Sequence, residues 1–178
     1  MRPATIARNY AEALFELGEA KGAAQAYGDW LESLAGAVSA SAAIEAVLMS
    51  PRVTKAQKQR ILAEGLAGAP REVVLFLQAV VKRGRQALFG TMALEYQGLL
   101  DVKFNRVRAG VTVARPASET LQRAIIAAIA KVVGKDVIAR FEVDSSILGG
   151  VVVRVGDRFF DGLIRRRMAT LRRLLLAR

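Results

Sequence analysis

Cysteine and histidine are both absent from the 178-residue chain. Their absence excludes disulfide bonds, thiol nucleophiles, imidazole general bases and zinc sites built from either residue. No uninterrupted apolar run approaches the roughly 20 residues that a membrane-spanning helix needs. The opening MRPATIARNY has no apolar stretch resembling a signal peptide, so we expect the protein to stay in the compartment where it is made.

The positive charge of the chain is large and unevenly distributed. The net charge is +11, with 12 basic and 10 acidic residues in 1–105 (net +2) and 15 basic and 6 acidic residues in 106–178 (net +9). Such an excess suits nucleic acid, an anionic membrane surface or an acidic protein as partner. A simple preference for arginine, with 20 Arg against 7 Lys, would give the same composition, so composition alone leaves these alternatives open.

Helical periodicity covers the first hundred residues in six stretches. Ser50-Pro51 and Gly68-Ala69-Pro70 interrupt the pattern, while Thr54 and Gln57 have the spacing of a capping box. Short connections favour antiparallel neighbours. We therefore expect a six-helix bundle over residues 1–105.

Strand periodicity begins after residue 105. Apolar residues alternate over 107–113 and 137–143, separated by a helical stretch that Ser118 can cap and Gly134 can end. Gly156-Asp157 is a plausible hairpin turn between strands at 151–155 and 158–161. A terminal helix should follow, with an apolar stripe of Ile164, Met168, Leu171 and Leu175. The predicted fold class is α+β: a six-helix bundle followed by a small α/β domain, residues 106–178, of order β-α-β-β-β-α.

Catalytic chemistry finds little support in the sequence. Gly134-Lys135 lacks the upstream glycine of a phosphate-binding loop. Ser145 and Ser146 have no histidine to activate them. Three aspartates stand at strand ends or turns, where Asp favours local backbone hydrogen bonds: Asp144, Asp157 and Asp161. We predict a non-catalytic protein with no cofactor, metal site or small-molecule ligand.

Two features point instead to binding. The fifth helical stretch, VVLFLQAVV over 73–81, has apolar residues on nearly every side. The first helical stretch shows the same character less strongly. Two such helices could leave a groove for a partner's amphipathic helix, or could both be core helices; the pattern leaves both open. The terminal segment carries Arg165, Arg166, Arg167, Arg172 and Arg173, which form either a solvated face or a basic surface for an acidic partner.

These segments resemble a known family. The sequence DSSILGGVVVRVGDRFFDG (144–162), with the arginine-rich stretch after it, closely resembles the C-terminal signature of the δ subunit of F-type ATP synthase, the family of the mitochondrial oligomycin-sensitivity-conferring protein. The opening ATIARNYAEALFELGEAKG (4–22) resembles the first helix of the same family. Two departures are visible: Leu163 replaces the usual serine, and Gly18 stands where alanine is common.

The resemblance implies a non-catalytic stator subunit that links the catalytic head to the membrane-anchored stalk and resists rotation during ATP synthesis. It implies that residues 1–105 bind the N-terminal helix of an α subunit, and that 106–178 bind b-type stalk subunits. It also implies attachment to the cytoplasmic face of a bacterial inner membrane through the complex. The expected contacts are Tyr10, Ala13, Leu14, Leu77, Val80 and Val81 for the α subunit, and Arg165, Arg166, Arg172 and Arg173 for the stalk.

A basic nucleic-acid-binding module is the competing interpretation, because a net charge of +9 after residue 105 would suit RNA or DNA. Against it, aromatic residues make up only 6% of the chain. Residues 106–178, which carry this charge, also have no RNP-like aromatic strand and no Gly-x-x-Gly loop of the KH type.

Overall fold

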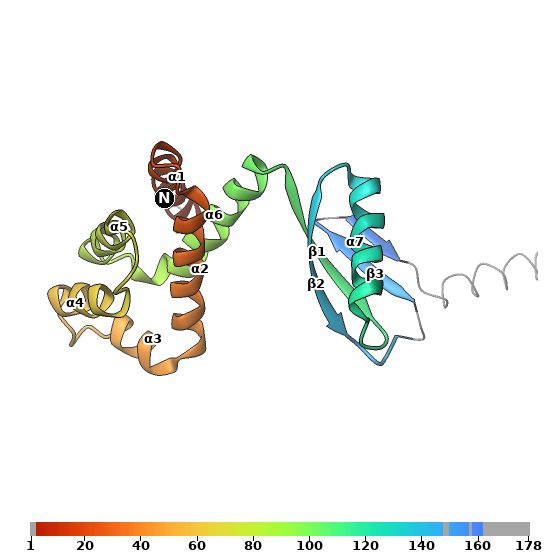
Figure 1. Cartoon of the computed structure of the whole chain (residues 1–178). Helices are drawn as coiled ribbons and strands as arrows, with labels where there is room; N and C mark the ends of the chain where they lie inside the picture. Colours follow the sequence, from red (N-terminus) through yellow and green to blue (C-terminus); the bar gives the residue numbers. More distant parts are fainter. Residues whose placement is uncertain (1–2, 148–149, 157, 162–178) are drawn as a thin grey trace, which may run out of the picture. The chain divides into compact units, whose positions relative to one another are not determined.

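A computed structural model describes residues 3–147, 150–156 and 158–161 (Figure 1). The chain divides into two compact units, Met1–Leu100 and Asp101–Arg178. The division falls slightly before the expected boundary at residue 105. Asp101 begins the second unit, and its carboxylate pairs with Arg106 at 2.9 Å and with Arg108 at 2.7 Å, on the strand that follows.

The first unit is built from the six predicted α-helices, with one short 3-10 turn between the last two. Side chains cap two of these helices: the Thr54–Gln57 capping box is present, and the Ser41 side chain accepts a hydrogen bond from the Ile44 amide. The helices are α1 (Pro3–Ala20), α2 (Ala24–Ala40), α3 (Ala42–Met49), α4 (Lys55–Gly65), α5 (Arg71–Lys82) and α6 (Phe89–Lys103), with the 3-10 turn η1 (Gln86–Leu88).

Tyr96 of α6 lies at the centre of the first unit. Its hydroxyl donates a 2.8 Å hydrogen bond to the carbonyl oxygen of Ala24, at the start of α2. Its ring packs edge-on against Phe15 of α1, with 5.7 Å between ring centroids. Burial raises the pKa of the Tyr96 phenol, so this hydroxyl keeps the proton that it donates. One side chain thus joins α1, α2 and α6.

Two glycines make room for this tyrosine. A Cβ added to Gly28 would lie 2.6 Å from a methyl carbon of Leu100 and 3.0 Å from the Tyr96 ring. A Cβ added to Gly18 would lie 2.9 Å from the Ala24 backbone and 3.0 Å from the Tyr96 hydroxyl. The departure from alanine at position 18 therefore has a steric reason in this chain.

The second unit is a four-stranded sheet with a helix on one face (Figure 1). Its strands are ordered β2-β1-β3-β4. The pair β1–β2 is parallel, with α7 as the crossover, while β1–β3 and β3–β4 are antiparallel. The elements are β1 (Arg106–Val113), α7 (Glu119–Val133), β2 (Asp136–Val143), β3 (Val151–Val155) and β4 (Arg158–Asp161). The predicted order is confirmed through β4; the expected terminal helix lies outside the described residues.

Local chemistry sets the ends of α7 and the β3–β4 hairpin. The Ser118 side chain accepts a hydrogen bond from the Leu121 amide, and Gly134 ends the helix in the left-handed conformation at φ 71°. Gly156, with φ 56°, begins the hairpin turn. The core lies between α7 and the sheet, where Ile129 packs with alternate β1 residues such as Val111.

We predict that a fragment of residues 1–105 folds by itself. It retains all of α6 and the whole buried cluster that includes Leu14, Tyr27 and Tyr96. Circular dichroism should show a strongly helical fragment with one cooperative melting transition. A fragment without cooperative melting would show that the helical unit needs the rest of the chain.

Gly28→Ala should lower the free energy of unfolding by about 1–2 kcal/mol, because overpacking against Leu100 and Tyr96 outweighs the gain of up to ~1 kcal/mol in helix propensity. The matched control is Gly36→Ala in the same helix, where a Cβ meets nothing within 4 Å. That change should stabilise by roughly 0.5–1 kcal/mol. Urea unfolding followed by fluorescence of Trp30, the one tryptophan of the chain, measures both. Equal effects of the two changes would contradict the steric argument.

Candidate partner-binding surfaces

Helix α5 contributes mainly to the core. Val73, Leu77, Val80 and Val81 are fully buried, whereas Leu75 on the opposite side is 53% exposed. Helix α4 covers a further side, because the Gln59 and Gln78 side chains each donate to the other residue's backbone carbonyl, at 2.9 and 3.3 Å. The nearly continuous apolar surface of α5 therefore reflects a helix packed on several sides.

The six residues expected at the α-subunit groove divide into two groups. Leu14, Leu77, Val80 and Val81 are completely buried, so in this structure they belong to the core. Tyr10 is half-buried and Ala13 is exposed. The inward face of α1 is the stripe of Ala7, Ala11, Leu14 and Gly18. Tyr10 and Ala13 lie beside this stripe, so they are the two expected contacts within reach of a partner.

A surface hollow of about 280 Å³ surrounds Tyr10 and Ala13. It joins one face of α1 to the turn that follows α5. Its lining is Ile6, Asn9, Tyr10, Ala13, Arg83 and Arg85. The α1 members are spaced three and four residues apart, which puts them on one helix face. Ile6, Asn9 and the two arginines are not among the contacts that the sequence predicts, although Ile6 lies four residues before Tyr10 and Asn9 four residues before Ala13.

The end of α5 fixes both arginines. Gly84 is left-handed, with φ 69°, and its amide donates to the carbonyl of Val81 at 2.8 Å. The Arg85 amide donates to the carbonyl of Val80 at 3.1 Å. These two bonds form a Schellman motif, which turns the chain back toward α1. In the sequence, Lys82-Arg83-Gly84 indicates only the end of a helix. It does not indicate which residue the Arg83 and Arg85 side chains contact.

Tyr10 is where these arginines meet. Arg83 and Arg85 each donate from Nη1 to the Tyr10 hydroxyl oxygen, at 3.3 and 3.4 Å. The Arg85 guanidinium carbon also lies 5.5 Å from the Tyr10 ring centroid, a cation–π geometry. The ring also packs edge-on against Phe76, with centroids 6.0 Å apart. The hollow is thus apolar along α1 and cationic at its α5 end.

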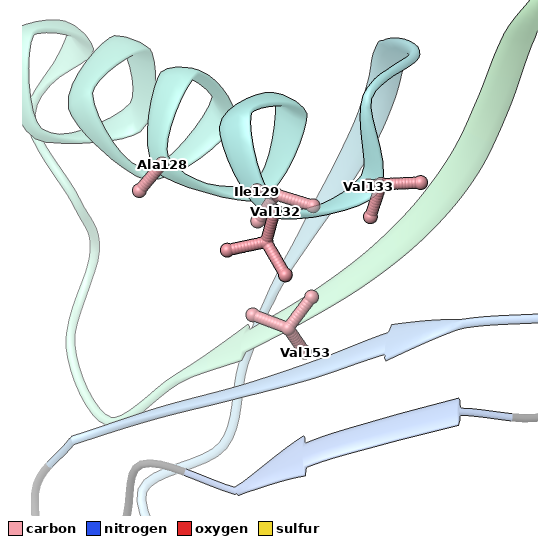
Figure 2. Close-up of a pocket in the computed structure, with 5 residues that line it drawn as sticks. All are labelled: Ala128, Ile129, Val132, Val133 and Val153. Carbon is pink, nitrogen blue, oxygen red and sulfur yellow. The ribbon is translucent and has the colours of Figure 1, made fainter.

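The second unit carries an apolar pocket of about 190 Å³ between α7 and β3 (Figure 2). Ala128, Ile129, Val132 and Val133 project from α7, and Val153 of β3 faces them from the sheet. Val132 is 71% exposed, an unusual position for a valine on the sheet side of a helix. Within the part of the chain that the structure describes, the pocket beside Val153 is therefore left open to a further apolar group.

The opposite face of the sheet carries three arginines, two of which pair with carboxylates: Arg108 with Asp101 at 2.7 Å and Arg140 with Glu142 at 3.8 Å. Gly110 pairs with Arg140 on β2 and with Arg154 on β3, so these two arginines flank a position without a side chain. Arg108, Arg140 and Arg154 line one surface hollow of this face, with Gly110 between the last two. The four terminal arginines expected to bind the stalk, Arg165, Arg166, Arg172 and Arg173, lie outside the described residues, as does the apolar stripe expected beside them.

Of the three aspartates considered as catalytic candidates, Asp144 is the one whose side chain the structure describes, and its role is local. The Asp144 carboxylate accepts a 2.8 Å hydrogen bond from the Ser146 amide, and the hydrogen bonds with Ser146 lower the pKa of Asp144. This is the turn role predicted for it. Within residues 3–147, 150–156 and 158–161, no group of acidic side chains is arranged to hold a metal ion.

No single helix in the described part of the chain is long and apolar enough to cross a bilayer. The pair α2 and α3 passes on length and composition, but the chain bends by 100° between them.

Comparison with known proteins gives one consistent result. The family model described as ATP synthase delta (OSCP) subunit matches residues 6–175. A protein of Gemmatimonas aurantiaca named ATP synthase subunit delta is 41% identical over 170 residues, covering 95% of this chain and 92% of its own. A protein of the same name from Anaeromyxobacter sp. is 35% identical over 174 residues, covering 96% and 97% of the two chains.

The fold is also shared with a solved structure. A chain in the cryo-EM structure of the Toxoplasma gondii mitochondrial ATP synthase hexamer has a TM-score of 0.68 and 24% identity, over 97% of this chain and 98% of that chain. The family match favours the stator interpretation over a nucleic-acid-binding module. The chain belongs to the ATP synthase delta (OSCP) subunit family and is a non-catalytic peripheral-stalk subunit of that membrane-associated enzyme, with other ATP synthase subunits as its partners.

Proposed function

We propose that the two units bind two different subunits of the enzyme. The helical unit takes up the N-terminal helix of an α subunit, and the α/β unit binds the b-type stalk at the cytoplasmic face of a bacterial inner membrane. The observation that carries the first assignment is the hollow beside Tyr10 and Ala13, the two expected contacts that reach the surface.

The shape of this hollow suits a helix. Ile6, Tyr10 and Ala13 follow one face of α1 for two turns, roughly 10 Å at 1.5 Å per residue. Ala13 is the smallest of them and is exposed, so a partner backbone could approach α1 closely there. An amphipathic helix laid in a groove uses contacts at this spacing.

The second assignment rests on charge. Arg108, Arg140 and Arg154 border one hollow of the sheet, and the segment after residue 161 adds the four expected arginines. Exposed ion pairs contribute only about 0–1 kcal/mol each. The charge should therefore act mainly on the rate and orientation of association, while apolar contacts hold the complex. Acidic stalk helices are the partner that this arrangement favours.

Ala13→Trp should weaken binding of a synthetic peptide with the α-subunit N-terminal sequence roughly tenfold or more, because the indole would fill the hollow. Calorimetric titration measures the affinity, and circular dichroism checks the fold. The matched control is Ala37→Trp, at an exposed position of α2. Unchanged affinity in folded Ala13→Trp protein would remove Ala13 from the binding surface.

Replacing Arg166, Arg172 and Arg173 together by Gln should slow association with a soluble stalk fragment, roughly tenfold at low salt. It should also flatten the salt dependence of the association rate, because fewer charges remain for salt to screen; the Debye length is about 10 Å at 0.1 M salt. Stopped-flow kinetics over a salt series measures both quantities. The control removes the same charge from three exposed arginines of the first unit: Arg8, Arg52 and Arg60. If both triple variants keep the original rate and salt slope, the terminal arginines are a solvated face.

A further inference from the structure

The two arginines beside Tyr10 are held in fixed positions. Arg83 is the last residue before the left-handed turn at Gly84, and Arg85 is the first after it, with its amide bonded to Val80. The Tyr10 ring contacts both Phe76 and the Arg85 guanidinium, at centroid distances of 6.0 and 5.5 Å. The arrangement of Tyr10, Arg83 and Arg85, here called the arginine–tyrosine cluster, therefore exists before any partner binds.

The cluster has an unbalanced positive charge. Its two guanidinium groups converge on a single hydroxyl oxygen, at 3.3 and 3.4 Å. Among the described residues no carboxylate lines the hollow, and neither arginine forms an ion pair. Two like charges held this close repel each other, and an anion placed between them would remove that cost. Elsewhere in the first unit, exposed arginines such as Arg8 and Arg60 each pair with a glutamate one helical turn away.

The hydrogen-bonding pattern specifies the kind of anion. Because the Tyr10 oxygen accepts from both arginines, its own proton remains to be donated outward. The hollow therefore presents guanidinium N–H groups from two arginines and one phenolic O–H. A group that only accepts hydrogen bonds fits such a site, and charged acceptors bind guanidinium most strongly. Among protein side chains, an ionised Asp or Glu meets both requirements.

We propose that the arginine–tyrosine cluster binds a side-chain carboxylate on the α-subunit N-terminal helix. The inference rests on the proposed function, because it assumes that this helix lies over Tyr10 and Ala13. The apolar residue Ile6 and the small Ala13 lie on the same face of α1 as Tyr10, so they would contact the apolar side of that helix. The carboxylate then fixes the position of the helix along α1. The partner is thus an amphipathic helix with an acidic residue bordering its apolar face.

A double-mutant experiment with the full chain tests this proposal. The probes are a synthetic peptide with the α-subunit N-terminal sequence, and the same peptide with every Glu and Asp replaced by Gln and Asn. Arg85→Gln should weaken binding of the acidic peptide roughly tenfold, because Arg85 is half-buried, and Arg83→Gln roughly threefold, because it is exposed. Tyr10→Phe, which keeps the ring but loses the donor, should also weaken it severalfold. The neutral peptide should bind wild-type protein more weakly and respond little to any of these changes.

The controls separate this role from a structural one. Arg60→Gln removes the same charge at an exposed position of α4 and should leave the affinity for both peptides unchanged. Thermal melting verifies that each variant is folded. If wild-type protein binds both peptides equally, or if the arginine variants lose affinity for both equally, the carboxylate assignment is wrong while the proposed function stands. If wild-type protein binds neither peptide, the proposed function fails and this inference fails with it.

Discussion

The hydrogen bond from the Tyr96 hydroxyl to the Ala24 carbonyl joins α6 to α2, and the same ring packs against Phe15 of α1. The ring of Tyr96 occupies space that Gly18 and Gly28 leave by having no side chain, so α1 and α2 can approach α6 closely. A second tie between α2 and α6, from the Gln97 amide to the Glu32 carboxylate at 2.7 Å, holds the same helices further along. The inward stripe of α1 is set by this packing. The packing therefore also determines which residues of α1, such as Tyr10 and Ala13, stay at the surface.

Helix periodicity predicts the elements of the first unit well, because apolar spacing and capping residues act locally. The Thr54–Gln57 box and the glycine at position 84 are readable for that reason. Periodicity does not separate core from surface on a helix that is packed on several sides. Val80 and Val81 of α5 illustrate this: the sequence allows either role, and their burial depends on helices that are distant along the chain.

Arg83 and Arg85, which line the hollow beside Tyr10, also show that local patterns do not reveal tertiary contacts. Arg83 has the sequence position of an ordinary helix-ending cation, and it does have that position in the structure. Its meeting with Tyr10, 73 residues earlier, depends on a tertiary contact that no local pattern contains. In the second unit the strand pattern is sufficient, because alternation assigns each residue to a face and one face is covered by α7.

The Schellman turn at Gly84 has a consequence for mutational studies of this surface. Nothing lies within 4 Å of a Cβ built at this position, so another residue would fit there sterically. The left-handed backbone would nevertheless be strained, and the chain could relax by moving Arg83 and Arg85. If the proposed surface binds the α-subunit helix, a substitution at position 84 would change that binding although position 84 itself does not contact the helix. In a screen for assembly defects, position 84 would score as a contact residue although its effect passes entirely through the backbone.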